Sequence, residues 1–345
     1  MHKFSIIGHF AFGYEFLDGQ TIKTKTITKE LENQLGAQQV LKIDTHGGKK
    51  TLFKAPFQVF KALKKSSNVI IFPAHNGLRV YAPLLVFFKT FFKKRKIHYV
   101  VIGGWLAKFL ENKKLLVKNL KKFDGIYVET STMKTALEVK GFTNVFVIPN
   151  CKELTVLKEE ELVYANSEPY KLCTFSRVCK QKGIEDAINA VIFANEHFGR
   201  TVYSLDIYGQ VDKNEIEWFN NLQKNFPSYI KYGGLVPFDR SVEVLKNYFA
   251  LLFPTRFYTE GIPGTILDAY AAGLPIISVK WLNFSDILDD CVCIGYDFES
   301  QTQLKEILIS ENLNERLNAL KVNCLNSAKK YLPNQIIKEF ISRIE

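Results

Sequence analysis

Short runs of apolar, β-branched and aromatic residues recur along the whole chain, and the segments between them carry apolar positions at helical spacing. In the first half these runs are Phe4–Ile7, Val69–Phe72, Tyr99–Ile102, Gly125–Val128 and Val145–Ile148, and in the second half Leu172–Phe175, Ser204–Tyr208, Tyr229–Tyr232, Ala250–Phe253 and Pro275–Val279. Such apolar runs are typical of parallel strands buried on both faces, with helices covering the sheet. We therefore expect an α/β protein with two Rossmann-like domains.

The boundary between these domains is predicted near Pro149 and Asn150, where the polar stretch 152–169 begins. A length of 345 residues also suits two domains. We expect an N-terminal domain over 1–150 and a C-terminal domain over 151–332.

The segment from Glu260 to Pro275 carries the clearest chemical pattern. It places a carboxylate before a Gly-x-Pro-Gly turn and predicts a helix from Pro263 to Ala272, with Asp268 inside it. A helix N-terminus that opens from a glycine-rich loop binds phosphate through free N–H groups and its partial positive charge. The two carboxylates suit hydroxyl groups of the same ligand. Phosphate and hydroxyls together indicate a nucleotide sugar.

This segment resembles the E-x7-E signature of the retaining glycosyltransferases of family 4, also called glycosyl transferases group 1, with Asp268 in place of the second Glu. The resemblance implies the GT-B fold, in which two Rossmann-like domains face each other across a cleft. It also implies that Glu260 contacts the transferred sugar and that Asp268 contacts the ribose. The donor would further bind at Gly261, Ile262, Pro263, Gly264 and Thr265. By the same analogy the final helix, about 333–345, packs back onto the N-terminal domain.

Arg177 and Lys182 follow the strand-like run that ends at Phe175. Two cations delivered by one strand end can reach one diphosphate, because ligands of parallel sheets lie at the carboxyl ends of the strands. In the family the matching residues bind the donor diphosphate and stabilise the charge of the leaving nucleoside diphosphate.

Other donor and acceptor residues follow from the resemblance with less specific patterns. Gly209, at a strand end, and Leu235, in a Gly-Gly-Leu-Val-Pro turn, would lie near the nucleotide base, and Gly19 would approach the diphosphate. Many members carry a His-Gly pair where this chain has Gly103-Gly104. His75, followed by Asn76, is the nearest substitute and is predicted on the acceptor side.

Charge is distributed unevenly between the two halves. Residues 1–150 hold 25 Lys and Arg against 9 Asp and Glu, a net charge of +16, within a total of +11 for the chain. Residues 51–100 contain ten basic residues and no acidic one. Such an excess favours an anionic partner, which is a membrane surface, a nucleic acid or a polyanionic glycan.

The run Leu84–Lys96 predicts a buried aromatic helix with a basic end that touches anionic lipid headgroups. The chain starts on a strand-like run and has no apolar run long enough to span a bilayer, so we expect neither a signal peptide nor a spanning helix. The expected location is the cytoplasm, peripheral on the inner face of the cell membrane.

The resulting hypothesis is a retaining transferase that moves a sugar, most simply from a UDP-sugar, to a glycan or lipid-linked acceptor in bacterial surface-polysaccharide assembly. No Asp-x-Asp motif is present and the six cysteines lack metal spacing, so no metal and no cofactor beyond the donor is expected. The alternatives are a catalytically silent partner subunit and a nucleotide-sugar epimerase of the same fold. A nucleic-acid binder is disfavoured because no RNP-like or helix-turn-helix signature is present.

Overall fold

The computed structural model describes residues 1–14, 19–47 and 49–344. The chain divides into two compact units. The first contains Met1–Glu153 and Tyr331–Glu345, and the second contains Leu154–Lys330. The chain thus returns to the first unit through its last helix, α14 (Pro333–Ile344), which packs beside α1.

The first unit is built on a six-stranded parallel sheet with the strand order β2-β1-β3-β4-β5-β6. The strands are β1 (His2–Gly8), β2 (Val40–Asp44), β3 (Ser66–Ile71), β4 (Lys96–Val100), β5 (Gly125–Val128) and β6 (Val145–Val147). The other helices are α1 (Gly19–Leu35), α2 (Lys49–Leu52), α3 (Ala55–Lys65), α4 (His75–Lys89), α5 (Leu106–Phe109), α6 (Lys114–Leu120) and α7 (Ser131–Glu138).

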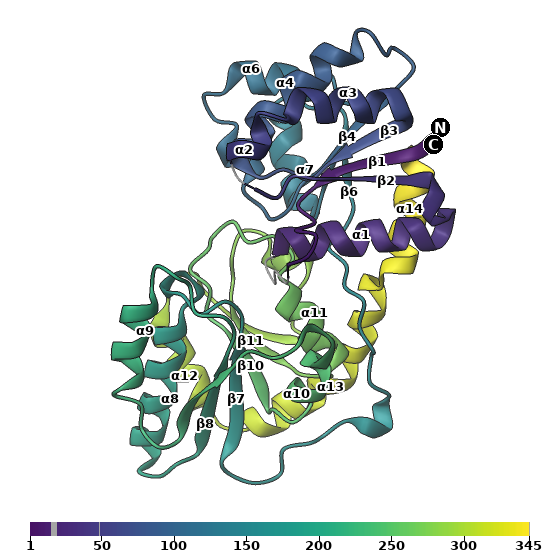
Figure 1. Ribbon diagram of the computed structural model, residues 1–345. Helices are drawn as coiled ribbons and strands as arrows, with labels where there is room; N and C mark the ends of the chain where they lie inside the picture. Colours follow the sequence, from purple (N-terminus) through teal and green to yellow (C-terminus); the bar gives the residue numbers. More distant parts are fainter. Residues whose placement is uncertain (15–18, 48, 345) are drawn as a thin grey trace. The chain divides into compact units, whose positions relative to one another are not determined.

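Helices cover both faces of this sheet (Figure 1). Helices α3, α4 and α6 lie on one side of the strands, where their apolar residues form a core with Val69, Ile71 and Tyr99. Helices α1 and α14 lie on the other side, over Phe4 and Ile70. Both faces of each central strand are therefore buried, which explains the continuous apolar runs of the sequence.

The second unit repeats this architecture with the strand order β12-β11-β10-β7-β8-β9, again all parallel. Its strands are β7 (Tyr170–Phe175), β8 (Tyr203–Tyr208), β9 (Ile230–Gly234), β10 (Ala250–Phe253), β11 (Ile276–Val279) and β12 (Cys293–Tyr296). Helices α8 (Ile184–Phe198), α9 (Ile216–Gln223) and α12 (Gln301–Leu308) lie on one side, and α10 (Ser241–Leu245), α11 (Gly264–Ala271) and α13 (Leu313–Ala328) on the other (Figure 1). The prediction of two parallel α/β sheets is confirmed.

Two local predictions need correction. The helix expected from Pro263 starts at Gly264, and Pro263 occupies the N-cap position with an extended backbone. The aromatic run from Leu84 is not a single buried helix, because α4 ends at Lys89 and the ring of Phe91 is 71% exposed. Helix α3 covers one side of α4 only, through contacts of Phe60 with Phe88 and Phe92.

Candidate functional site

The predicted phosphate-binding cations lie at the carboxyl end of β7. Arg177 follows the strand, and Lys182 closes a short 3-10 turn before α8. Gly183 joins this turn to α8 with φ of +70°, and a Cβ there would come within 1.9 Å of the Pro254 carbonyl oxygen. Only glycine therefore allows the turn to pack directly against the loop that follows β10.

That packing brings Lys182 to Glu260, 78 residues further along the chain. The Lys182 ammonium donates a hydrogen bond to the Glu260 carboxylate, and their side chains are 14% and 16% exposed. The ammonium also lies 5.2 Å from the ring centroid of Phe257. The Thr255 hydroxyl donates to the same carboxylate oxygen of Glu260 at 3.3 Å. The Asn283 amide donates to the Glu260 backbone carbonyl, so the backbone that carries Glu260 is held in place as well.

Arg177 has a looser environment than Lys182. Its side chain is 56% exposed, and its guanidinium Nη1 lies 3.5 Å from a carboxylate oxygen of Asp212. An exposed ion pair of this kind contributes little to stability, so a ligand anion can replace Asp212 at little cost.

The N-terminus of α11 follows Glu260 in the chain, through Gly261 and Ile262. Pro263 provides no side-chain cap, and the first N–H groups of a helix lack intrahelical partners. The hydroxyl oxygen of Thr265, in the first turn, is shielded from solvent and has no hydrogen-bond partner within the described ranges 1–14, 19–47 and 49–344. A buried hydroxyl is costly to leave unbonded, so Thr265 suits a ligand with acceptor oxygens.

Asp268 lies deeper in α11 than the sequence suggested. Its side chain is 3% exposed, and it accepts a hydrogen bond of 2.6 Å from the hydroxyl of Ser241, the first residue of α10. Sequence analysis did not identify Ser241, since nothing in its neighbourhood relates it to residue 268. The ribose contact of Asp268 stays a prediction.

Gly209 has a structural role at the end of β8. Its φ is +135°, and a Cβ there would lie 1.8 Å from the carbonyl oxygen of Ser176. The Tyr232 hydroxyl donates to the Gly209 carbonyl at 2.8 Å. Leu235, just after β9, is exposed. Gly209 is thus required by the close approach of two strand ends, and the role of both residues beside a nucleotide base stays a prediction.

In the first unit, His75 and Asn76 open α4 at the carboxyl end of β3. The ring of His75 lies against that of Trp105, which follows the neighbouring strand β4, with centroids 3.9 Å apart and planes tilted by 30°. Partial burial lowers the pKa of His75, and the charges of Arg79 and Lys113 lower it further. Asn76 is exposed, and Gly19 opens α1 with open space around its Cα.

Sequence analysis missed a pair of histidines at this same carboxyl edge of the sheet. His9 follows β1, and His46 follows β2. The ring nitrogens His9 Nε2 and His46 Nδ1 share a hydrogen bond of 3.1 Å. His9 Nδ1 also bonds the Thr21 hydroxyl at 2.7 Å. The position of His9 after a predicted strand was the available signal, but β2 was not predicted, so His46 could not be placed beside it.

The loop that carries His9 is held by Asp44. Its carboxylate accepts backbone N–H bonds from His46, Phe12, Phe10 and Ala11. Burial alone would raise the pKa of Asp44, but these four bonds bring it below its ordinary value. Among the residues that the structure describes, no group of three or more His, Cys, Asp or Glu side chains could hold a metal ion.

A comparison with known protein families shows which family model this sequence matches. Residues 169–307 match the model of the family described as Glycosyl transferases group 1. This range contains the predicted donor residues of the second unit, from Arg177 to Asp268.

Several solved structures resemble the chain. TarM from S. aureus has a TM-score of 0.67 and 16% identity, over 85% of this chain, which spans 58% of the length of TarM. The lipopolysaccharide outer core galactosyltransferase WaaB has a TM-score of 0.71 and 16% identity, over 99% of both chains. HepE from Anabaena, solved with UDP-glucose, has a TM-score of 0.72 and 14% identity, over 99% of this chain and 100% of its own. At these identities the likeness establishes the fold, which is GT-B.

Proposed function

We propose that the protein moves a sugar from a nucleotide-diphosphate sugar to a glycan or lipid-linked acceptor, starting from the match of residues 169–307 to the model of the Glycosyl transferases group 1 family. The pairing of Lys182 with Glu260, beside the start of α11, carries this proposal. This pair places a cation that can bind phosphate next to a carboxylate that can accept hydrogen bonds from sugar hydroxyls. The UDP-glucose in the HepE structure and the UDP in that of TarM support a UDP-sugar as donor.

The diphosphate would bind Arg177, Lys182 and the N-terminal N–H groups of α11, with Thr265 donating its hydroxyl. An ammonium has three donors, so Lys182 can keep its bond to Glu260 and still bind a phosphate oxygen. These cations and the helix N-terminus stabilise the charge that develops on the leaving nucleoside diphosphate. Glu260 would accept a hydrogen bond from a hydroxyl of the transferred sugar.

In the proposed reaction, the bond between the anomeric carbon and the diphosphate oxygen breaks while the acceptor oxygen bonds to the same carbon on the same face. The acceptor proton passes to the leaving phosphate oxygen, so no protein base is required and the anomeric configuration is retained. Arg177, Lys182 and the helix dipole neutralise the leaving group, so we propose that no metal is needed.

A screen of nucleotide sugars tests this function. A donor present at 100 times its dissociation constant should add about 2.7 kcal/mol to the free energy of unfolding of the protein, read as a thermal shift. The product of transfer from that donor should keep the anomeric configuration in NMR spectra, with activity unchanged by a chelator. An inverted product, or activity that only magnesium or manganese restores, would contradict the mechanism. Donor binding without transfer or hydrolysis would favour a silent partner subunit.

Asp268→Asn should weaken nucleoside diphosphate binding about tenfold, because the amide loses the charge that strengthens a ribose hydrogen bond. Ser241→Ala is the matched control, since it removes a neighbour of the same carboxylate and keeps its charge. Calorimetric titration with UDP measures both variants. Equal affinity of Asp268→Asn and the unchanged protein would remove Asp268 from the nucleotide site.

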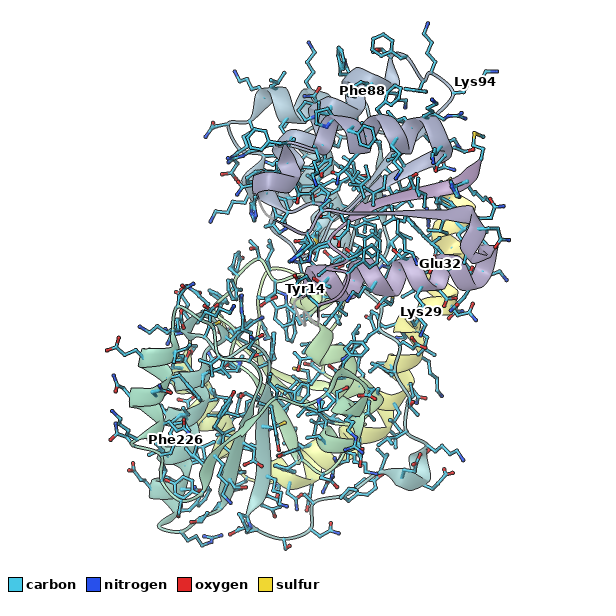
Figure 2. The ribbon with its side chains drawn as sticks, viewed as in Figure 1. Tyr14, Lys29, Glu32, Phe88, Lys94 and Phe226 are labelled. Carbon is cyan, nitrogen blue, oxygen red and sulfur yellow. The ribbon has the colours of Figure 1, made fainter. Side chains whose placement is uncertain are left out.

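We also propose that the first unit docks on an anionic membrane from the cytoplasmic side. Its α3–α4 surface exposes aromatic rings, which we call the phenylalanine surface: Phe53, Phe57, Phe60, Phe87 and Phe91. Exposed lysines, among them Lys64, Lys93 and Lys94, surround it, and residues 51–100 contain no carboxylate. Phe88 and Lys94 lie on the side of this unit away from α1 and α14 (Figure 2). No helix within the described ranges is long and apolar enough to cross a membrane.

The protein should therefore sediment with anionic vesicles but not with neutral ones, and high salt should release it. Each basic residue near an anionic surface contributes about 1 kcal/mol, so Lys93→Gln with Lys94→Gln should reduce binding about tenfold or more. Phe57→Ser with Phe91→Ser should also weaken it, through lost ring insertion. Lys213→Gln with Lys224→Gln, on the second unit, is the control. Equal partitioning onto neutral and anionic vesicles would refute docking by charge.

A further inference from the structure

The first unit contains a groove along α6 that the proposed donor chemistry does not use. The groove has a volume of about 680 Å³ and is lined by five lysines with a single carboxylate, that of Glu111. We call it the lysine groove; its lysines are Lys113, Lys114, Lys118, Lys121 and Lys140. In the described part of the chain none of them forms an ion pair with a carboxylate. Their charges are therefore available to an anionic ligand.

The lysine groove follows helix α6, so the course of this helix shows which way the groove runs. Helix α6 (Lys114–Leu120) connects the carboxyl end of β4 to the start of the parallel neighbour β5, so it runs from the carboxyl edge of the sheet to the opposite edge. Lys113 and Lys114 lie near the carboxyl edge, and Lys121 lies past the other end of the helix. Because sites in parallel α/β sheets form at the carboxyl edge, the groove leads away from the place where a ligand binds.

Two of these lysines are positioned by aromatic rings. The ammonium of Lys113 lies 4.4 Å from the ring centroid of Phe109, and that of Lys121 lies 5.4 Å from that of Phe142. A cation over a ring face is attracted by the ring quadrupole, which limits the freedom of a long side chain. Part of the charge in the groove is therefore held in place before any ligand arrives.

At the carboxyl edge an aromatic cluster of Trp105, His75 and Phe109 adjoins Lys113, the lysine at this end of the groove. The Trp105 indole N–H donates to the Ile102 carbonyl at 2.7 Å, which fixes its ring. The ring of Phe109 meets that of Trp105 edge to face, with centroids 5.1 Å apart, and is the ring beneath Lys113. Trp105 and Phe109 are half-buried. Fixed aromatic faces provide apolar contact area for the C–H face of a sugar ring.

We propose that the aromatic cluster and the lysine groove bind an anionic glycan as the acceptor. A sugar ring packs on Trp105, and phosphate or carboxylate groups of the same chain bind the lysines along α6. This inference rests on the proposed transferase function and names its acceptor class. A glycan chain suits the groove better than a bilayer does, because the aromatic rings beside it, those of Trp105 and Phe109, are half-buried. The phenylalanine surface instead projects its rings into solvent.

The test measures binding of three oligosaccharide-sized probes to the full chain: an oligogalacturonate, a short-chain polyphosphate and neutral maltohexaose. A single-stranded oligonucleotide and anionic vesicles are measured beside them. The groove variant combines Lys118→Gln, Lys121→Gln and Lys140→Gln. The control variant, with the same loss of charge on the phenylalanine surface, combines Lys64→Gln, Lys93→Gln and Lys94→Gln.

The groove variant should bind oligogalacturonate at least about tenfold more weakly, because it loses three charge-assisted contacts, and the control should bind it normally. Maltohexaose should bind weakly and equally to both. Trp105→Ala should weaken oligogalacturonate binding, and Trp105→Tyr should restore part of it, whereas polyphosphate, which lacks a sugar ring, should not respond to either change.

Three results would overturn the inference. Equal weakening in groove and control variants would indicate general charge attraction. Tighter binding of a single-stranded oligonucleotide than of oligogalacturonate would indicate a nucleic-acid site. Loss of anionic vesicle binding in the groove variant alone would assign the groove to the membrane.

Failure of this inference differs from failure of the proposed function. Transfer onto neutral acceptors with a KM that the groove variant does not change would overturn the acceptor site and leave the transferase intact. Conversely, absence of any nucleotide-sugar binding would remove the transferase, while selective loss of oligogalacturonate binding in the groove variant would still establish a glycan site.

Discussion

Lys182→Ala should lower the turnover of sugar transfer by about a hundredfold or more, because it removes the positioned cation that stabilises the leaving diphosphate. The side chain of Lys182 is largely buried, bonded to Glu260 and flanked by the rings of Phe253 and Phe257. A water molecule cannot supply the lost charge. Steady-state release of nucleoside diphosphate, measured with the donor found by the screen, gives the turnover.

Lys180→Ala is the matched control for this change. Lys180 lies in the same 3-10 turn, but it is exposed and its ammonium lies over the ring of Trp218, 5.8 Å from the centroid. It should keep turnover within about threefold, as expected of a surface residue away from the ligand. Turnover by Lys182→Ala close to that of the unchanged protein would remove Lys182 from the mechanism. Both variants should still unfold in a cooperative thermal transition, which shows that they fold, although Lys182→Ala leaves Glu260 without its partner and should melt at a lower temperature.

Glu129→Ala should destabilise the first unit by about 3–5 kcal/mol, because it leaves the buried ammonium of Lys23 without its counter-charge. These side chains are 3% and 2% exposed, and Lys23 Nζ lies 2.5 Å from Glu129 Oε1. Lys23 also donates to the Val101 carbonyl at 3.1 Å, and the Gly103 N–H donates to Glu129 at 3.2 Å. The pair thus ties α1 to the loops after β4 and β5.

The double replacement Lys23→Met with Glu129→Leu is the control for buried charge. It removes both charges and should recover most of the lost stability, since apolar residues of similar volume often replace a buried ion pair at little cost. A chain with two units need not unfold in a single transition, so the measurement is segment-resolved hydrogen exchange. The loss of protection is expected in α1 and β5. Equal destabilisation by single and double variants would mean that packing, rather than an unpaired charge, sets the cost.

The apolar runs of the sequence predicted the central strands of both sheets because such strands are buried on both faces. The two strands absent from the predicted runs are β2 (Val40–Asp44) and β12 (Cys293–Tyr296). Each lies at an edge of its sheet, although the other two edge strands, β6 and β9, were predicted. In β2 the exposed Lys42 interrupts the apolar pattern, as a strand with one neighbour and less cover allows. In β12 the strand has only four residues, and Gly295 interrupts its apolar run. Which strand lies at the edge of a sheet is decided only when the whole sheet assembles.

The donor-site residues were predictable as local patterns, because a strand end, a glycine and a helix start lie next to one another in the chain. Arg177 precedes and Lys182 ends one short turn, and Glu260 precedes one helix. Which residues meet across the fold was not predictable in this way. Ser241 bonds Asp268 from another helix, and His9 meets His46 from another strand.

The exposure of the aromatic residues was likewise decided only by tertiary structure. Helical spacing shows which rings of α4 share a side, but it does not show how far α3 extends over them. The sequence by itself determined the fold class and the local phosphate-binding pattern, since both depend on neighbours in the chain. The tertiary structure decided the ion pair of Lys182 with Glu260 and the exposed and grooved surfaces of the first unit. These depend on contacts between segments whose packing no local pattern records.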